Sequence, residues 1–284
     1  MVNVGYYNGE IAPLEELKIP VLDRAVYFGD GCYDASTFAN NHIFGKKDHF
    51  DRFYNSCRLL DIPFAMSYEE LEAELQKVID AFDGDHGFIY WQVSRGTGLR
   101  AHQYTQLGLK PNLMAMACPC ELTPMSAKYK LISLEDKRFY FCNIKTLNLL
   151  PSVLAYDEAI EAGCQENVFY RPEFGKKRVT ECAHSNILMI KDGCLIAPPR
   201  DNLILPGITL KHLLMLAQRN GIPTKETPFT LEELADADEI IVSSSGSLCT
   251  PACELDGKPV GGKDPKTLKT LQDAYLAYYA EDTK

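Results

Sequence analysis

A single lysine in an uncharged, largely apolar stretch is the first residue whose setting suggests chemistry. Lys145 is the only charged residue between Phe139 and Leu150. On a strand, Lys145 would share a face with Phe139 and Phe141. Loss of hydration there lowers the pKa of a lysine and leaves a neutral amine, which attacks aldehyde carbons. The stretch alone favours a simpler interpretation, in which the lysine extends its ammonium group into solvent at a strand end.

Two further patterns are suited to binding anions. Arg100 and His102 would point the same way on an extended segment and offer paired donors to a carboxylate. Without other information, a solvated loop explains that pair better. The backbone amides of Ile208 and Thr209 follow Gly207 at the start of a predicted helix, where amides face an anion. Thr209 could equally be a plain helix cap.

Hydrophobic spacing and turn residues predict the elements that must position these side chains. Hairpins are expected at 5–11 and 35–44, with turns at Asn8-Gly9 and Asn40-Asn41. Helices are expected near 49–60, 67–82 with Ser67 as the cap, 151–162, 209–220 and 266–279. Strands are expected at 88–94, 113–118, 128–134, 139–145, 166–170, 186–191, 194–197 and 239–243.

This mixture of strands and helices predicts an α+β fold in two domains, residues 1–120 and 121–284. Pro119, Pro124 and Ser126 mark the expected linker. The net charge of −10, without a dense basic run, argues against a nucleic-acid partner. No apolar run is long enough to predict a membrane span.

Ten cysteines are present without a C-x-x-C pair, so no metal site is expected. The first ten residues lack the features of a signal peptide. Reduced thiols and a cytoplasmic location are therefore expected.

Seven short motifs, in order along nearly the whole chain, resemble those of class IV (fold type IV) aminotransferases, which use pyridoxal phosphate (PLP). They are FGDGCY at 28–33, HFDR at 49–52, RGTGLRAHQ at 95–103, IKTLNLL at 144–150, VTE at 179–181, LPGIT at 205–209 and SSSGSLCTP at 243–251. The 95–103 motif is most similar to D-amino acid aminotransferases. Branched-chain aminotransferases and aminodeoxychorismate lyases generally lack its Arg-Ala-His element.

The resemblance implies a role for each candidate residue. Lys145 would form a Schiff base with PLP, Glu181 would pair with the pyridine nitrogen, and Leu205 would pack on the ring. The phosphate would be bound by Arg52, Ile208, Thr209, Ser244 and Ser245. The substrate carboxylate would be held by Tyr33, Arg100 and His102, the last two contributed by the partner subunit of a homodimer.

The implied fold has a small N-terminal α/β domain and a larger, β-barrel-like C-terminal α/β domain. The implied reaction is ping-pong transamination of D-amino acids, in which D-alanine and 2-oxoglutarate give pyruvate and D-glutamate. The partners would then be small-molecule substrates. Alternatives are an L-branched-chain aminotransferase, an aminodeoxychorismate lyase and a non-catalytic relative that binds a phosphorylated ligand.

Two departures from the family pattern bear on this interpretation. Residues 182–185 read Cys-Ala-His-Ser where D-specific relatives commonly carry Gly-Ser-Ser-Ser, so two hydroxyl donors near the phosphate are missing. His184 could replace one of them. Asp34 stands where a glutamate is common, and its shorter side chain is expected to weaken a hydrogen-bond relay near Lys145.

Overall fold

The computed structural model describes residues 3–284, which divide into two compact units. The first unit runs to Glu121 and also includes Ile144–Asn148 and Glu281–Lys284. The second contains Leu122–Asn143 and Leu149–Ala280. The division expected after residue 120 falls close to Glu121, but the sequence did not indicate that residues 144–148 belong with the first unit.

The first unit is built on an antiparallel sheet of six strands in the order β2-β1-β6-β5-β3-β4. The bounds are β1 Val4–Tyr7, β2 Glu10–Pro13, β3 Gly31–Ala39, β4 His42–Ile43, β5 His86–Ser94 and β6 Asn112–Cys118. Positive φ angles at Asn8, Gly9, Asn40 and Asn41 form the two tight turns, so both predicted hairpins are confirmed.

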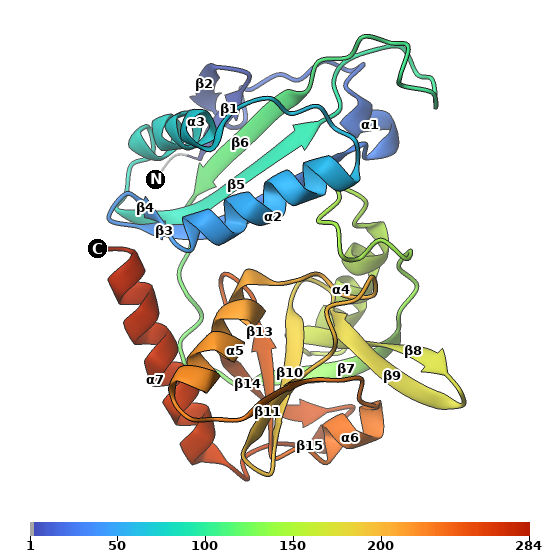
Figure 1. Cartoon of the computed structure of the whole chain (residues 1–284), viewed down its shortest axis with the longest axis vertical. Helices are drawn as coiled ribbons and strands as arrows, with labels where there is room; N and C mark the ends of the chain where they lie inside the picture. The colour runs from blue at the N-terminus through green and yellow to red at the C-terminus, as the bar shows by residue number, and fades with distance from the viewer. Residues whose placement is uncertain (1–2) are drawn as a thin grey trace. The chain divides into compact units, whose positions relative to one another are not determined.

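Two helices cover one face of this sheet (Figure 1). They are α2 Lys46–Leu59 and α3 Tyr68–Asp80, and both confirm predicted helices. Ser67 caps α3 in a capping box with Glu70. Apolar side chains of both helices pack with alternate residues of β5 and β6 in one core, in which Trp91 is fully buried. A short helix, α1 Arg24–Phe28, was not predicted.

A buried carboxylate joins β3 to α2 inside this core. Arg52 donates from Nε to Asp34 Oδ2 at 2.8 Å and from Nη2 to Oδ1 at 2.7 Å. His49 Nδ1 lies 2.7 Å from Asp34 Oδ1. Burial by itself would raise the pKa of Asp34, but Arg52 and His49 outweigh it and hold that pKa well below its usual value. Because neighbouring residues on a strand point to opposite faces, Asp34 faces away from Tyr33. The relay near Lys145 stays a prediction.

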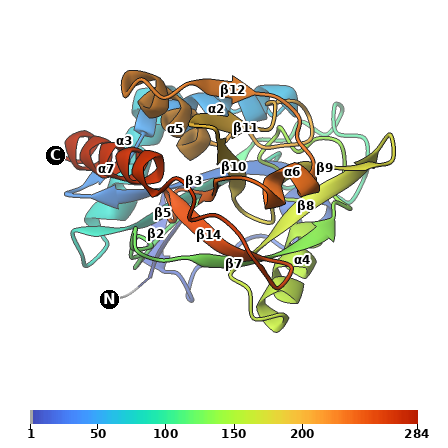
Figure 2. The ribbon, with the colours of Figure 1, turned by 90° about the horizontal axis from the view of Figure 1, so that it is seen from below.

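The second unit contains a nine-stranded mixed sheet, whose main path runs β12-β11-β10-β13-β14-β7-β8-β9, with β15 paired to β14. Strands β14, β7 and β8 are mutually parallel neighbours, and β14 and β7 run side by side in Figure 2. The bounds are β7 Tyr129–Glu135, β8 Glu166–Glu173, β9 Lys176–Cys182, β10 Asn186–Lys191, β11 Cys194–Ala197, β12 Thr224–Glu226, β13 Glu239–Ser243, β14 Thr250–Leu255 and β15 Lys258–Pro259.

Four helices accompany this sheet in the part of the chain that the structure describes: α4 Leu150–Glu161, α5 Ile208–Arg219, α6 Leu231–Ala235 and α7 Pro265–Asp282. All but α6 were predicted. Gly163 and Gly221 take positive φ angles just beyond α4 and α5, as expected of glycines that end helices. Within residues 3–284, no helix is both long enough and apolar enough to cross a membrane.

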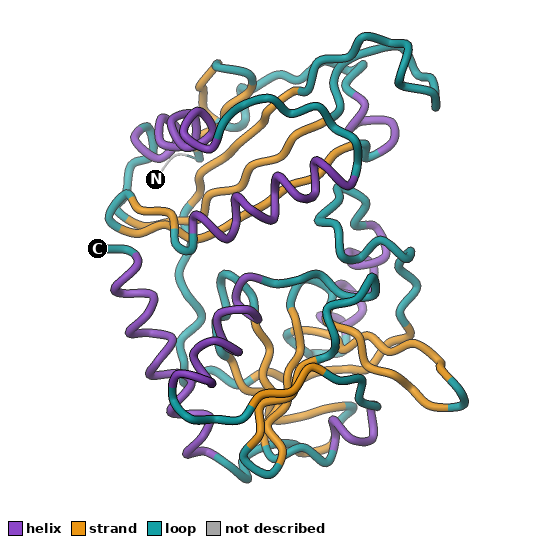
Figure 3. The backbone as a smooth tube through the Cα atoms, in the orientation of Figure 1, coloured by secondary structure: helices purple, strands orange, loops and turns teal. Residues whose placement is uncertain are grey.

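The predicted strand at 139–145 is wrong. The stretch between β7 and α4 is drawn as loop in Figure 3 and contains no strand. Tyr140 and Phe141 are 65% and 62% exposed, so the aromatic run does not enter a core. Tyr140 instead has the Arg171 guanidinium 4.4 Å from its ring centroid. The apolar strand from which the chemistry of Lys145 was first argued therefore does not exist.

We predict that Asp34→Asn destabilises the protein by about 3–5 kcal/mol at neutral pH, because it leaves the Arg52 cation buried without its counter-charge. The folded-state pKa of Asp34 is depressed, so its contribution is complete above the usual aspartate value of 3.8 and is lost as pH falls below it. Urea unfolding of both proteins should give a difference in free energy that shrinks at acid pH.

Asp51→Asn on the exposed side of α2 is the matched control. Asp51 pairs with Lys47 at the surface, so its replacement should change stability little. Equal losses from the two substitutions, or a difference that grows on acidification, would contradict the argument.

Candidate active site

The segment Ile144–Asn148 docks on β3 in the first unit and thereby sets the position of Lys145. Tyr33 N donates to Lys145 O at 2.9 Å, and Leu147 N donates to Gly31 O at 3.2 Å. A Cβ at Gly31 would lie 2.4 Å from Val93 O and 2.7 Å from Leu147 Cδ1. Only glycine therefore lets the segment approach this closely.

The docking brings together Lys145 and Tyr33, two residues that the sequence predicted for the site. Lys145 Nζ lies 4.3 Å from the centroid of the Tyr33 ring. That ring stacks on Tyr90, with centroids 5.2 Å apart. The amine is thus placed over an aromatic platform, although it stands on a docked loop rather than on a strand.

Arg100 and His102 converge on one aromatic ring of the same unit. The loop that carries them is irregular, so the extended segment expected for them is wrong, and both side chains are exposed. Arg100 Cζ lies 5.2 Å from the Phe28 ring centroid, and the centroids of the His102 and Phe28 rings are also 5.2 Å apart. A shared ring therefore brings the two predicted carboxylate ligands near one another.

A cavity of about 310 Å³ lies beside His102 within the first unit. Its lining includes Thr146 and Asn148, which follow Lys145 in the docked segment. Arg52, the predicted phosphate ligand, is nearly buried and directs Nε and Nη2 to Asp34. Its role toward phosphate stays a prediction.

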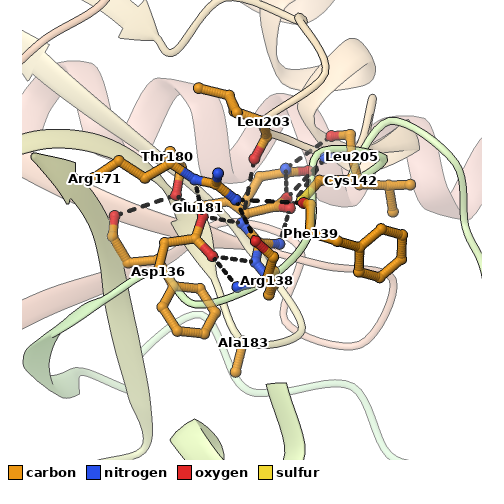
Figure 4. A network of polar contacts seen from close by, with 12 residues as sticks. Asp136, Arg138, Phe139, Cys142, Arg171, Thr180, Glu181, Ala183, Leu203 and Leu205 are labelled. Carbon is orange, nitrogen blue, oxygen red and sulfur yellow. Dashed lines mark hydrogen bonds and ion pairs between the residues drawn. The ribbon is translucent and has the colours of Figure 1, made fainter. Parts of the chain in front are cut away.

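Glu181, the predicted partner of the pyridine nitrogen, is 5% exposed near the end of β9 in the second unit. Arg138 Nη1 donates to its Oε1, and Asn186 Nδ2 donates to Oε2 at 2.8 Å. Leu205 N lies 3.1 Å from both carboxylate oxygens. Figure 4 shows this network, in which Glu181 is fixed by donors from three separate segments.

Arg138 is shared with a second buried carboxylate. Its Nε and Nη2 each donate to Asp136 at 2.9 Å, while Arg171 and Thr180 donate to Asp136 Oδ2 at 3.0 Å (Figure 4). Two arginines thus balance two acids. Asp136, Arg138 and Arg171 were not predicted from the sequence. The only local signal for the first two was a run of four charged residues, Glu135 to Arg138, after a predicted strand, which is ordinary at strand ends.

Because Arg138 contacts both acids, it affects the pKa of Glu181 and that of Asp136. Burial raises the pKa of Glu181 above its usual value, and Arg138 opposes this only in part because it also serves Asp136. Burial would raise the pKa of Asp136 too, but Arg138 and Arg171 lower it below its usual value. Although burial disfavours a charged guanidinium, Glu181 and Asp136 raise the pKa of Arg138.

Asn186 connects the acid to the start of α5. It donates from Nδ2 to Leu205 O at 3.0 Å as well as to Glu181. A Cβ at Gly207 would lie 1.8 Å from Asn186 Oδ1, so position 207 requires glycine. Gly207 is the N-cap of α5 and provides no side-chain hydrogen bond to the helix. The first amides of α5, which include Ile208 and Thr209, therefore point out of a buried helix start.

The serines of the predicted phosphate turn follow β13. Ser243 pairs with Asn186 in the β10–β13 register, which brings this turn to the same end of the sheet. Ser244 Oγ lies 2.8 Å from Ser247 Oγ and accepts from Ser247 N at 3.2 Å. Ser243 Oγ is buried and has no hydrogen-bond partner among residues 3–284.

These features fit the demands of PLP. The pyridine nitrogen needs a buried acid, and Glu181 is an acid that would serve this role. The phosphate needs a helix start and hydroxyl donors, which α5 and the serine turn would supply. An uncapped, buried helix start beside an orphaned hydroxyl is a suitable anion site, and it lies in the same unit as the acid.

The departure at 182–185 places an imidazole where relatives have a hydroxyl. His184 Nδ1 lies 2.8 Å from Oε2 of the fully buried Glu166. The ring of Tyr156 meets the imidazole edge-on, with centroids 4.7 Å apart. His184 Nδ1 is therefore within ion-pair distance of Glu166, although Glu166 Oε2 has no hydrogen-bond partner among residues 3–284. The role of His184 as a replacement donor stays a prediction.

Comparisons with known proteins agree with this site. The family model for class IV aminotransferases matches residues 31–255. The chain is 35% identical to the D-alanine aminotransferase of Listeria monocytogenes serotype 4b over 97% of this chain and 94% of that protein. It is 34% identical to the D-alanine aminotransferase of Staphylococcus haemolyticus over 96% of each.

Solved structures show the same fold. The branched-chain aminotransferase from Escherichia coli superposes with a TM-score of 0.88 at 24% identity, covering 100% of this chain and 96% of that chain. The branched-chain aminotransferase from the archaeon Thermoproteus uzoniensis, solved with norvaline, gives a TM-score of 0.87 at 23% identity, covering 98% and 95%. The two-domain α+β fold of type IV enzymes, inferred from the sequence, is thus confirmed.

The family match extends over most of the chain, and the relatives match it almost from end to end. Together with a buried acid and an uncapped helix start, this decides both family and cofactor. The chain belongs to the class IV aminotransferases and is a PLP-dependent aminotransferase.

Proposed function

We propose that the chain transaminates D-amino acids, with D-alanine and 2-oxoglutarate giving pyruvate and D-glutamate. The observation that carries this proposal is the 34–35% identity to D-alanine aminotransferases over nearly the full length of each protein. The convergence of Arg100 and His102 on Phe28 supports it, because a small substrate with one carboxylate needs a compact cationic trap.

Each residue keeps the role expected from its chemistry. Lys145 would hold the cofactor through its side-chain amine and would move the proton at substrate Cα. PLP, when bound, supplies the electron sink and stores the amino group between the two half-reactions. Glu181 holds a proton on the pyridine nitrogen, with Arg138 and Asn186 fixing the orientation of its carboxylate.

The remaining contacts orient the cofactor and the substrate. Leu205 packs on the ring, while the amides of Ile208 and Thr209 and the hydroxyls of the serine turn hold the phosphate, as we propose also for Arg52. The residues proposed for the phosphate turn are Ser244 and Ser245. Tyr33 shares the substrate carboxylate with Arg100 and His102. We also propose a cytoplasmic homodimer in which that basic pair acts across the interface.

The rival with a specific observation in its favour is an L-branched-chain aminotransferase. Solved enzymes of that name share the fold with TM-scores up to 0.88, but at 23–25% identity. The fold is common to both activities, so it cannot choose between them. The choice rests on the higher identity to D-alanine aminotransferases, with the loop that carries Arg100 and His102 in support.

We predict that D-alanine, and not L-alanine or L-leucine, bleaches the visible absorbance of the cofactor-loaded enzyme and releases pyruvate. The proposed carboxylate trap is expected to hold only the D-enantiomer with its Cα hydrogen toward Lys145. Single-turnover spectra with each amino acid measure this directly. Bleaching by L-leucine alone would instead identify the branched-chain activity.

We predict that Lys145→Ala lowers turnover by about 10³-fold or more, because it removes both the covalent attachment and the proton carrier. The visible band of lysine-bound cofactor should be lost as well. Lys137→Ala, an exposed lysine of the preceding loop, is the control and should leave both unchanged. Full turnover by the Lys145 variant would refute the assignment.

We predict that Lys145→Ala and Arg100→Ala complement one another. If Arg100 acts across a dimer, each hybrid dimer contains one site with both residues intact. Random reassociation then restores roughly a quarter of the wild-type activity. Mixing after mild denaturation and refolding measures this. Purified hybrids no more active than the mean of the two parent variants would place Arg100 in the same subunit as its lysine.

A further inference from the structure

The loop that carries Arg100 and His102 is held by a buried arginine of α1. Arg24 is 3% exposed and donates from Nη1 to the carbonyl of Ala101 at 2.6 Å. Ala101 is the residue between the two predicted carboxylate ligands. The Arg24 guanidinium also lies 4.7 Å from the Phe28 ring centroid, so all three basic side chains meet at this ring.

Asp30 joins Arg24 to a second anchor of the same loop. Arg24 Nε donates to Asp30 Oδ2 at 2.7 Å, and Arg95 Nε donates to Oδ1 and Oδ2 at 3.0 and 2.9 Å. Arg95 lies at the start of the loop, and its Cζ is 3.9 Å from the Tyr104 ring centroid. Side-chain contacts therefore hold the loop at its first residue, Arg95, at Ala101 and at Tyr104.

Arg95 is itself fixed to the body of the first unit. It donates from Nη1 to Asp61 O at 2.8 Å and from Nη2 to Leu60 O at 2.7 Å. A buried guanidinium keeps such bonds because losing them leaves charged donors without partners. The hydrogen bonds of the Arg24 and Arg95 guanidinium groups thus fix the loop relative to α1 and to the residues that follow α2. Lysine cannot reproduce two directed bonds of this kind.

We propose that Arg24 and Asp30 are positioning residues for substrate recognition, which hold Arg100 and His102 in the geometry that binds the substrate carboxylate. This inference rests on the proposed function, because it assumes that the Arg100 loop binds that carboxylate. Arg24 acts through Ala101 and does not touch the substrate. Its loss should weaken binding of carboxylate-bearing substrates while leaving the proton transfer by Lys145 intact.

The first test compares Arg24→Lys with the wild type on D-alanine and on D-alaninamide, which lacks the carboxylate. We expect the KM for D-alanine to rise about tenfold, the loss expected of one charge-assisted hydrogen bond, with kcat within about twofold. Reaction with D-alaninamide should not change. Arg58→Lys, an exposed arginine of α2, is the matched control and should behave as wild type.

A double-mutant cycle shows whether Arg24 acts through the trap. In an Arg100→Ala/His102→Ala background, Arg24→Lys should add less than about a twofold effect, because both side chains that it positions are gone. Effects that multiply, or equal losses on D-alanine and D-alaninamide, would overturn the proposal. If Arg24→Lys folds poorly by circular dichroism, Asp30→Asn serves in its place with the same expectations.

A readout independent of turnover is trypsin cleavage at the Arg100–Ala101 bond. Releasing the Ala101 carbonyl should loosen the exposed loop and speed this cut relative to other sites. An unchanged cleavage rate together with an unchanged KM would refute the proposal. Wild-type enzyme without D-alanine turnover would instead refute the proposed function, so the two failures are distinguishable.

Discussion

The desolvation of buried carboxylates is the constraint on which much of this structure depends. Asp34, Asp30, Asp136 and Glu181 are all buried or nearly so, and each would be costly to ionise without a cation at hydrogen-bond distance. An arginine is the cation at each of these four carboxylates. Because its fork has five donors, each guanidinium has bonds left over after it has neutralised its acid.

Those left-over donors connect irregular loops to the elements beside them. Arg24 reaches Ala101 O from its pairing with Asp30, and Arg95 reaches Leu60 O and Asp61 O from the same acid. In the second unit, Arg171 reaches Arg138 O from its pairing with Asp136. Irregular loops cannot be fixed by a ladder of backbone bonds, so these charged contacts give the loops their order.

Local rules predicted the elements whose signals lie within a few residues. Asn8-Gly9 forms the predicted turn because both residues adopt positive φ angles, and Ser67 caps the predicted helix through its own side-chain hydrogen bond. A strand was predicted at 139–145 because aromatic residues are common in strands. The prediction was wrong because Tyr140 packs on Arg171, which is distant in sequence. Composition cannot show such a partner.

The residues of the candidate site also fall into two groups, those that belong to a local motif and those whose partners are distant in sequence. Lys145, Tyr33 and Glu181 were proposed because motifs contain them, and the structure puts Lys145 beside Tyr33. Arg24 and Arg138 were missed because each is one ordinary arginine in the sequence. What makes them important is a carbonyl or carboxylate from another segment. Residues that position others are recognisable only when the segments they join are seen together.

Asn186 shows why the second unit can tolerate the altered run at 182–185. One amide group donates to Glu181 and to Leu205 O, while its oxygen occupies the space that a side chain at Gly207 would need. The acid and the start of α5 are therefore one rigid assembly, and movement of either would break a buried hydrogen bond. The hydroxyls missing from this run would have added donors to that assembly. The geometry that holds Glu181 depends on Arg138, Asn186 and Leu205 and does not require those hydroxyls. Their loss would change only the number of donors at the proposed phosphate site.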